Sequence, residues 1–196
     1  MIRLHKTIFV LILFVGLYVG AVPSARADTL TNTGTTTGGP VWNRPSQGNP
    51  PAPPASFGAT SVRYHVFQFN VGVTGTYDFL SQGTSPANWD NYLFLYRDSF
   101  SPSSQFTNVL IGNDDFPTTG RAGFNGVNLS VGVNYFLITT GFSNSDSGSF
   151  SNTITGPGAV LPGAAVPEPA TMLLLGTGLA GVAAKLRRRN KWAECS

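Results

Sequence analysis

Tyr92-Leu93-Phe94-Leu95-Tyr96 is the most informative run in this chain for its fold. Successive side chains of a β-strand point to opposite faces of the sheet, so a strand with one wet face alternates apolar and polar residues. Here both faces are apolar. The pattern predicts a central strand that is buried on both sides, between two layers of the molecule.

The chain on either side of this run has the pattern of an all-β domain, in which clusters of turn residues separate short strands. Between residues 58 and 156, aromatic and β-branched runs alternate with clusters of Gly, Asn, Asp, Ser and Pro. The short runs suit a single jelly-roll-like β-sandwich and leave no room for a crossover helix. The expected strands are residues 62–71, 75–80, 92–96, 108–111, 123–129, 135–140 and 148–155.

The first of these strands shows which face is expected to be buried. Its apolar set should face the core and its polar set should point to water, the two sets being Phe67, Phe69 and Val71, and Gln68 and Asn70. Val66 stands beside Phe67 and interrupts this alternation. The interruption predicts a β-bulge at Val66.

The segments that flank the domain are expected to lie outside its core. Residues 28–57 are mainly Thr, Gly, Asn and Pro, and apart from Val41 and Trp42 they bury too little apolar surface to offset the entropy of ordering. We interpret them as an extended leader with Trp42 docked on the domain edge. A proline-rich ligand motif is the alternative. Residues 157–165 are small and Pro-rich, which indicates a linker.

The charge of the central region excludes one class of partner. Residues 28–169 carry four arginines and eight carboxylates, a net charge of −4, although the whole chain carries +3. Nucleic-acid binding needs clustered Lys or Arg and is not supported. Cys195 is the only cysteine, so no disulfide forms within the chain and the domain depends on an apolar core.

The N-terminus has the layout of a secretion signal. Two cations precede an uncharged apolar run, residues 8–22. Ala25 and Ala27 then place small side chains at the positions that signal peptidase reads, so we expect the secretion machinery to export the chain and cleavage to follow Ala27. Residues 1–27 would thus be a signal peptide. A retained anchor helix is the alternative, because the run is nearly long enough to span a bilayer.

The C-terminus has three parts in a fixed order. Val166-Pro167-Glu168-Pro169 is followed by an uncharged apolar run, residues 170–184, and then by a basic stop. The basic residues are Lys185, Arg187, Arg188, Arg189 and Lys191. At ~1.5 Å per residue the apolar run covers about 22 Å, less than the roughly 30 Å of a bilayer core, which indicates a short, removable transmembrane helix. The positive-inside rule places the basic tail in the cytoplasm and the β domain on the opposite side of the inner membrane.

This order, over residues 166–191, resembles the PEP-CTERM sorting signal of Gram-negative bacteria that make extracellular polysaccharide. The resemblance implies recognition by an exosortase, a membrane-embedded cysteine transpeptidase-like enzyme that cleaves at or near the motif and transfers the protein onward. The four motif residues would then be substrate residues. A plain tail anchor is the alternative. Residues 192–196 run past the usual basic stop, and Cys195 is expected to be an inert thiol in a discarded tail.

The body of the chain shows a second resemblance. Several of its motifs are similar to those of bacterial pre-peptidase C-terminal domains, namely Tyr77-Asp78-Phe79, Trp89-Asp90-Asn91-Tyr92-Leu93-Phe94-Leu95-Tyr96, Gly112-Asn113-Asp114-Asp115, Val131-Gly132-Val133-Asn134-Tyr135 and Thr140-Gly141. Those domains are jelly-roll-like β-sandwiches attached to secreted proteins, and many bind calcium. The resemblance therefore implies the same sandwich and a calcium site.

Calcium is the one cofactor that the sequence suggests. Ca²⁺ requires hard oxygen ligands, and the loop residues that offer them are Asp90, Asn113, Asp114 and Asp115. Adjacent Asp114 and Asp115 would repel each other unless a cation or a hydrogen-bond donor neutralises them. The alternative is that these are turn residues bonded to their own backbone, because the spacing is not that of an EF-hand loop.

The sequence contains no recognisable catalytic constellation, which predicts a non-enzymatic protein. His65 is the one imidazole left after signal removal, and it lies in a predicted strand. No Gly-x-Ser-x-Gly elbow surrounds any Ser, and no Glu lies within residues 58–156 for a glycosidase pair. Trp89, at a loop–strand junction, is the candidate for stacking on a sugar ring. Its alternative role is to fill the end of the sandwich.

These observations predict an exported protein of the cell envelope. We expect an inner-membrane-anchored intermediate with its domain in the periplasm, followed by display at the cell surface or release into the extracellular matrix. The leading hypothesis is a structural or adhesive β-sandwich. The alternative is a Ca²⁺-dependent carbohydrate-binding module in the exopolysaccharide layer, and a secreted hydrolase is the third option.

Overall fold

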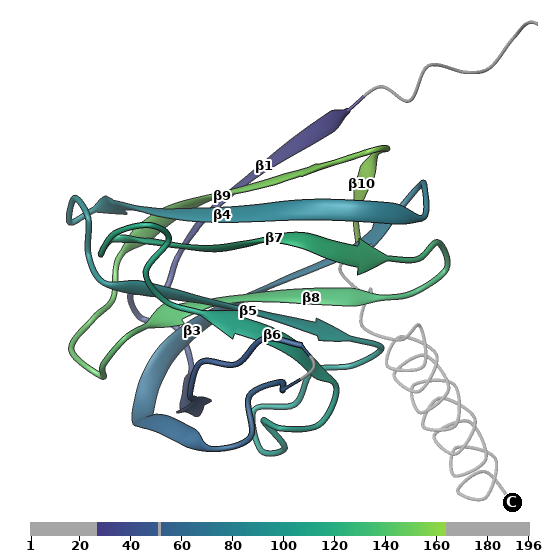
Figure 1. The fold of residues 1–196 in the computed structure, drawn as a ribbon. Helices are drawn as coiled ribbons and strands as arrows, with labels where there is room; N and C mark the ends of the chain where they lie inside the picture. The colour runs from purple at the N-terminus through teal and green to yellow at the C-terminus, as the bar shows by residue number, and fades with distance from the viewer. Residues whose placement is uncertain (1–26, 51, 164–196) are drawn as a thin grey trace, which may run out of the picture.

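The computed structural model describes residues 27–50 and 52–163, and these form ten strands in two antiparallel sheets that pack face to face (Figure 1). The predicted all-β class is confirmed, and the two packed sheets agree with a β-sandwich. Within the described residues, no helix is long and apolar enough to cross a membrane. The predicted signal helix and transmembrane helix lie outside the described residues.

The smaller sheet has four strands in the order β1-β9-β4-β7. Their bounds are Asp28–Thr35 for β1, Ser149–Gly156 for β9, Gly75–Ser85 for β4 and Arg121–Leu129 for β7. Alternation is clearest in β9, where Phe150, Asn152 and Ile154 are buried and the Ser and Thr residues between them lie on the outer face. This two-residue period fixes which face of the sheet packs on the core.

The larger sheet has the order β10-β3-β8-β5-β6, and β2 pairs with the first part of β3. The bounds are Val160–Pro162 for β10, Phe57–Val71 for β3, Tyr135–Gly141 for β8, Asn91–Arg97 for β5, Val109–Asn113 for β6 and Val41–Pro45 for β2. Each of the seven strands predicted from the sequence is present. Their ends differ from the prediction by at most five residues.

The predicted central strand is β5, which lies between β8 and β6 and is buried from Asn91 to Tyr96. Its two faces belong to different apolar clusters. Leu93 and Leu95 join the main core between the sheets. The residues that alternate with them join a second cluster on the outer face of the larger sheet, which consists of Trp42, Val62, Tyr64, Tyr92, Phe94, Tyr96, Val109 and Ile138.

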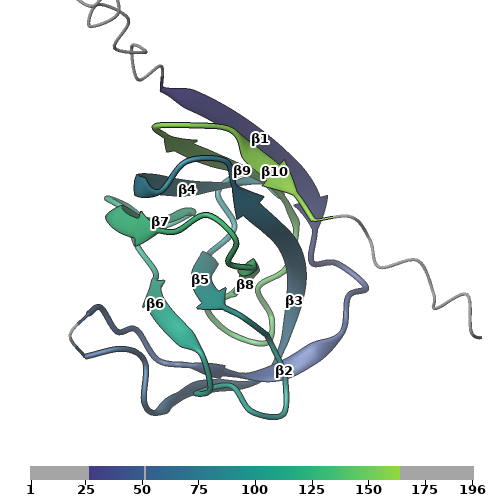
Figure 2. The same ribbon diagram turned by 90° about the vertical axis from the view of Figure 1, so that its right-hand side faces the viewer.

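The structure corrects the prediction that residues 28–57 are a leader outside the domain. β1 pairs with β9 along its whole length, and β2 pairs with the first part of β3, at the bottom of the view in Figure 2. Trp42 of β2 is only 3% exposed, and its indole N–H donates to Thr140 Oγ1 at 3.1 Å. Backbone pairing needs no apolar side chains, so a Thr-rich segment can complete a sheet, and one Trp can close a cluster.

The predicted linker, residues 157–165, also contributes to the domain. β10 pairs with β3 over Val160–Pro162, and the Val160 side chain is buried in the main core. β10 is thus an edge strand of the larger sheet, next to β3. All ten described strands and both apolar clusters therefore lie within residues 28–162, which makes this stretch a complete folding unit.

The predicted β-bulge at Val66 is wrong. The register of β3 with β8 runs without a shift from Tyr64 to Phe69. Val66 follows Val62 and Tyr64 on the outer face, whereas Phe67 packs against the main core. Val66 is exposed and belongs to neither apolar cluster, so the broken alternation reflects an apolar side chain on the outer face and not a slipped register.

Candidate metal site at one end of the sandwich

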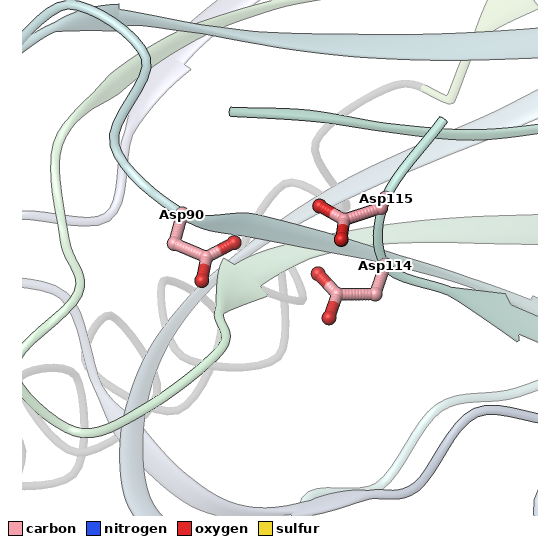
Figure 3. A group of neighbouring side chains, drawn as sticks. All are labelled: Asp90, Asp114 and Asp115. Atoms are coloured by element: carbon pink, nitrogen blue, oxygen red, sulfur yellow. The ribbon is translucent and has the colours of Figure 1, made fainter. Parts of the chain in front are cut away.

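Antiparallel pairing of β5 and β6 brings three carboxylates together. Leu93 of β5 lies opposite Asn113 of β6, so the loop that enters β5 and the loop that leaves β6 meet at the same end of the sheet. Asp90 precedes β5, and Asp114 and Asp115 follow β6. One oxygen atom of each carboxylate lies within 4.8 Å of the others, and Figure 3 shows the side chains projecting into a common space from the two loops.

Two oxygen atoms in this acidic cluster lack hydrogen-bond partners. Oδ1 of Asp90 and Oδ1 of Asp114 are buried, and no donor reaches them within the described residues. Burial raises the pKa of Asp114 to about 6, and the neighbouring carboxylates of Asp90 and Asp115 add to this effect. Burial also raises the pKa of Asp90, with further contributions from Asp146 and Asp115. The cluster is therefore unfavourable as three bare anions.

Arg44 is a cation whose charge acts on the acidic cluster, and it belongs to the segment that the sequence assigned to the leader. Its side chain is 3% exposed, and its guanidinium carbon lies 4.2 Å from the ring centroid of Tyr92. The guanidinium donates to the carbonyl oxygens of Pro45 and Phe142 at 2.7 and 2.8 Å. It makes no ion pair within 4.0 Å of a carboxylate among the described residues, where Arg97–Asp98 is the only one. Arg44 thus offsets part of the cluster's charge from a distance.

Asp146 adds a fourth carboxylate near this end of the sandwich. The β8–β9 loop reaches the site because Gly141 lies opposite Asn91 at the start of β5. The Asp146 carboxylate accepts hydrogen bonds from the backbone N–H and the hydroxyl of Ser143, at 2.8 and 2.6 Å. Its hydrogen-bond donors thus lie within its own loop, and its effect on the acidic cluster is electrostatic.

Asn113, the fourth predicted metal ligand, has another partner. Its side-chain N–H donates to the carbonyl oxygen of Gly123 at 2.6 Å, which links β6 of the larger sheet to β7 of the smaller sheet. Its role as a ligand stays a prediction. Asn113 is adjacent to Asp114 in the chain, but its amide N–H is used in this hydrogen bond between the two sheets.

Trp89, which the sequence proposed for stacking on a sugar ring, has a largely buried side chain. The side chain is 7% exposed, and its indole N–H donates to the carbonyl oxygen of Ser149 at 2.7 Å. A Cβ atom added at Gly148 would lie 2.6 Å from Trp89 Cδ1, so the ring lies directly against this glycine backbone. Trp89 fills the end of the sandwich, which is the alternative role that the sequence offered.

His65 lies away from the acidic cluster, in the middle of β3. Its ring packs edge-on against Phe150 with the centroids 5.3 Å apart, and its Nδ1 is buried without a partner in the described part of the chain. Burial lowers the pKa of this imidazole below its ordinary value. His65 contacts the aromatic core of the opposite sheet.

The acidic cluster fits a hard divalent cation. Ca²⁺ prefers carboxylate and carbonyl oxygens, and it takes six to eight of them in flexible arrangements. Asp90, Asp114 and Asp115 supply carboxylates from two loops, and two of their oxygens have unused acceptor capacity. The donor set contains no sulfur or imidazole, so it does not favour Zn²⁺ or copper.

Residues 165–189 match the family model described as the PEP-CTERM protein-sorting motif. No curated protein matches the chain. The match confirms the predicted sorting motif of Val166, Pro167, Glu168 and Pro169, and it includes most of the basic stop, ending two residues before Lys191. These residues lie outside the described part of the structure.

A PEP-CTERM motif implies export, membrane-anchored sorting and processing by an exosortase. The chain is therefore an exported protein with an exosortase sorting motif at its C-terminal end. The matched residues make up a small part of the chain, so they identify its route and not the activity of its β domain. The resemblance of the body to pre-peptidase C-terminal domains stays a prediction.

Proposed function

We propose that this protein is a structural or adhesive component of the cell surface or extracellular matrix, delivered there by an exosortase that processes its C-terminal motif. The match at residues 165–189 carries this proposal. The architecture supports it, because the last described strand, β10, ends at Pro162, just before the matched segment. Cleavage at the motif would leave both sheets and both clusters intact.

The test is mass spectrometry of the mature protein from its native host, compared with a strain that lacks the sorting enzyme. We expect a chain that begins at Asp28 and ends near residues 166–169 only when the enzyme is present. A Glu168→Ala variant should retain its basic tail, because the motif is disrupted, while a Glu194→Ala variant should be processed normally. A mature wild-type chain that still carries residues 185–191 would contradict the proposal.

The acidic cluster supports a second candidate function, a Ca²⁺-dependent carbohydrate-binding module. The observation that favours it is the meeting of Asp90, Asp114 and Asp115 with two buried, unpartnered oxygens. A bound cation would relieve the repulsion among these carboxylates and fix the two loops that carry them. Loops held in this way could present polar groups and the ion itself to the hydroxyls of a neutral or acidic glycan.

Calcium binding is testable on a recombinant protein spanning residues 27–163. We expect Ca²⁺ to raise the melting temperature of the wild-type protein, because it binds only the folded state. Asp114→Asn should abolish most of this shift. Asp98→Asn is the matched control, since Asp98 is an exposed carboxylate that pairs with Arg97 outside the cluster. A wild-type protein whose melting temperature does not respond to millimolar Ca²⁺ would exclude the calcium site.

The glycan part of this candidate needs a separate measurement. Exopolysaccharide purified from the host should retain the wild-type protein in the presence of Ca²⁺ and release it with EDTA. Asp114→Asn should bind no better than wild-type protein in EDTA. Retention that is unchanged by EDTA would show that glycan binding, if present, does not use the acidic cluster.

A further inference from the structure

The two sheets have several free edges, and most of them carry features that prevent pairing with another chain. β2 ends in Pro45 and its register with β3 is irregular. β10 has only three residues and ends in Pro162. At β6, the backbone of Gly112 is bonded in both directions to Gly48, at 3.0 and 2.9 Å. β7 has a register shift against β4 and a positive φ at Gly126.

β1 is the exception among the described edges. It has eight residues, and its register with β9 runs without a shift from Asp28↔Gly156 to Thr35↔Ser149. It contains no Pro, Lys or Arg, and its sequence is rich in Thr, which favours extended backbone. β1 therefore presents a long, regular edge with none of the usual devices against strand addition.

The backbone groups that face this free edge follow from the pairing on the other side. The N–H of Thr36 donates to the carbonyl oxygen of Gly148 at 3.0 Å, in continuation of the β1–β9 register. Hydrogen-bonded pairs alternate in an antiparallel ladder, so even-numbered residues of β1 bond to β9 and odd-numbered residues face outward. In agreement with this phase, the N–H of Thr29 bonds to its neighbour, the Asp28 carboxylate, at 2.8 Å.

Thr31 and Thr33 lie at the centre of this outward-facing set. Within the described residues, their backbone groups make no hydrogen bond outside the sheet ladder. Their side chains point to the outer face of the smaller sheet, where they lie beside Thr153 and Ser151 of β9. The free edge thus offers two adjacent hydrogen-bonding residues without any charged side chain between them.

We propose that two copies of this protein pair through β1, antiparallel, so that their four-stranded sheets become one continuous sheet. Directly opposite residues of an antiparallel pair share a face, which restricts the register. The centred register that satisfies this condition places Asn32 opposite Asn32 of the other copy, Thr31 opposite Thr33, and Thr29 opposite Thr35. In this register the outward-facing residues form the hydrogen-bonded pairs.

A second copy suits this edge better than an unrelated strand. The pairing is isologous, so one surface supplies both sides of the interface. Thr–Thr cross-strand pairs are favourable, and the only charged residue, Asp28, lies at opposite ends of the paired strands. At the two-fold axis, the two Asn32 residues lie opposite each other on the inner face of the sheet, so no charged side chains meet there.

The interface would be small. One added strand pair buries less surface than the roughly 1,200 Å² of a stable complex, so we expect a weak, concentration-dependent dimer in dilute solution. Display on a cell surface would raise the effective concentration and favour the dimer. Self-association of this kind goes beyond sorting and beyond calcium, since it uses neither the C-terminal motif nor the acidic cluster.

Analytical ultracentrifugation of the protein spanning residues 27–163 tests this proposal, because that stretch contains every described strand and both clusters. We expect the wild-type protein to show a monomer–dimer equilibrium. Thr31→Pro removes an outward N–H that the monomer does not use, and Pro is tolerated at such edge positions. It should weaken dimerisation by at least about tenfold. Thr31→Val keeps the N–H and should dimerise like the wild type.

A second variant guards against a folding defect in Thr31→Pro. The double substitution Thr31→Lys and Thr33→Lys leaves every backbone group in place but sets like charges opposite each other across the dimer. It should dissociate the dimer at low salt, and the dimer should return at high salt as the charges are screened. A wild-type protein that stays monomeric up to millimolar concentration would overturn the proposal. A dimer that neither Thr31→Pro nor the double Lys variant weakens would also overturn it.

Discussion

Asp114 is the residue at which burial and charge conflict most clearly. Burial raises the pKa of its carboxyl group most, and the charges of Asp90 and Asp115 raise it further. One of its oxygens has no hydrogen-bond partner in the described structure. Arg44 is buried nearby but is bonded to backbone carbonyls. The metal-free protein therefore holds a carboxylate that loses its proton less readily than an ordinary Asp, and a bound cation would stabilise its anionic form.

The pH dependence of stability should report this residue directly. The folded-state pKa of about 6 lies above the ordinary 3.8, so between these values the folded protein holds more protons than the unfolded chain. Stability of the calcium-free protein should then fall as the pH rises from about 4 to about 6, and it should stay lower above that range. Calorimetry in EDTA should show this fall for wild type and a smaller one for Asp114→Asn.

Asp98→Asn is the control in the same series, because it removes an exposed carboxylate outside the acidic cluster. His65 has the opposite sign, because burial lowers its pKa and stability falls as the pH drops below its ordinary value of 6.5. The comparison between variants removes this shared contribution. Identical slopes for wild type and Asp114→Asn would mean that the acidic cluster is solvated and carries no charge penalty.

The candidate site was only partly predictable at this scale. Residue type alone pointed to Asp90, Asp114 and Asp115, since loop carboxylates suit a hard cation. The proximity of Asp90 to the other two depends on β5 and β6 being neighbours, which a local pattern does not specify. Arg44 was missed because it lies in a segment without apolar periodicity, and the burial of Trp89 depends on packing against the distant Gly148.

At the scale of elements, strands with apolar alternation were predictable and strands without it were not. β5 and β8 have apolar side chains on both faces, and β9 alternates Phe150 and Ile154 with Ser and Thr, so the sequence shows these strands directly. β1 has Leu30 as its one large apolar side chain. It is a strand because its backbone pairs with β9, a long-range partner that composition cannot reveal.

The contribution of the early strands can be measured by shortening the protein. A protein spanning residues 58–156 lacks β1, β2 and β10, which exposes the aromatic face of β5 at Tyr92, Phe94 and Tyr96. We expect it to aggregate or to unfold without cooperativity, whereas residues 27–163 should show one cooperative transition in urea by circular dichroism. In that longer protein, Trp42→Ala should cost about 3–5 kcal/mol, because it empties the centre of the second cluster.

Trp42→Phe is the matched variant for this series. It keeps an aromatic ring against Tyr64 and Phe94 but loses the hydrogen bond to Thr140, so its cost should be smaller, about 1–2 kcal/mol. A protein spanning residues 58–156 that unfolds with the same midpoint and slope as residues 27–163 would show that β1, β2 and β10 are dispensable for stability.

On the scale of the whole molecule, the chain separates a folded body from a sorting segment. The body is complete by β10, and the matched motif begins only after it. The two parts also differ in charge, since residues 28–169 are acidic overall and the basic residues gather at the ends. Processing at the motif would therefore leave an intact, acidic domain.

The pairing of β1 with β9 also sets the order of events while the chain is being made. Thr29 and Thr155, whose hydroxyls are 3.3 Å apart, are separated by 126 positions in the chain. A ribosome releases the N-terminal strand first, so this strand must wait without its partner until almost the whole domain has emerged. Because long-range closure of this kind is slow, the domain would remain unfolded during synthesis and early export, in the state that a narrow translocation channel can thread.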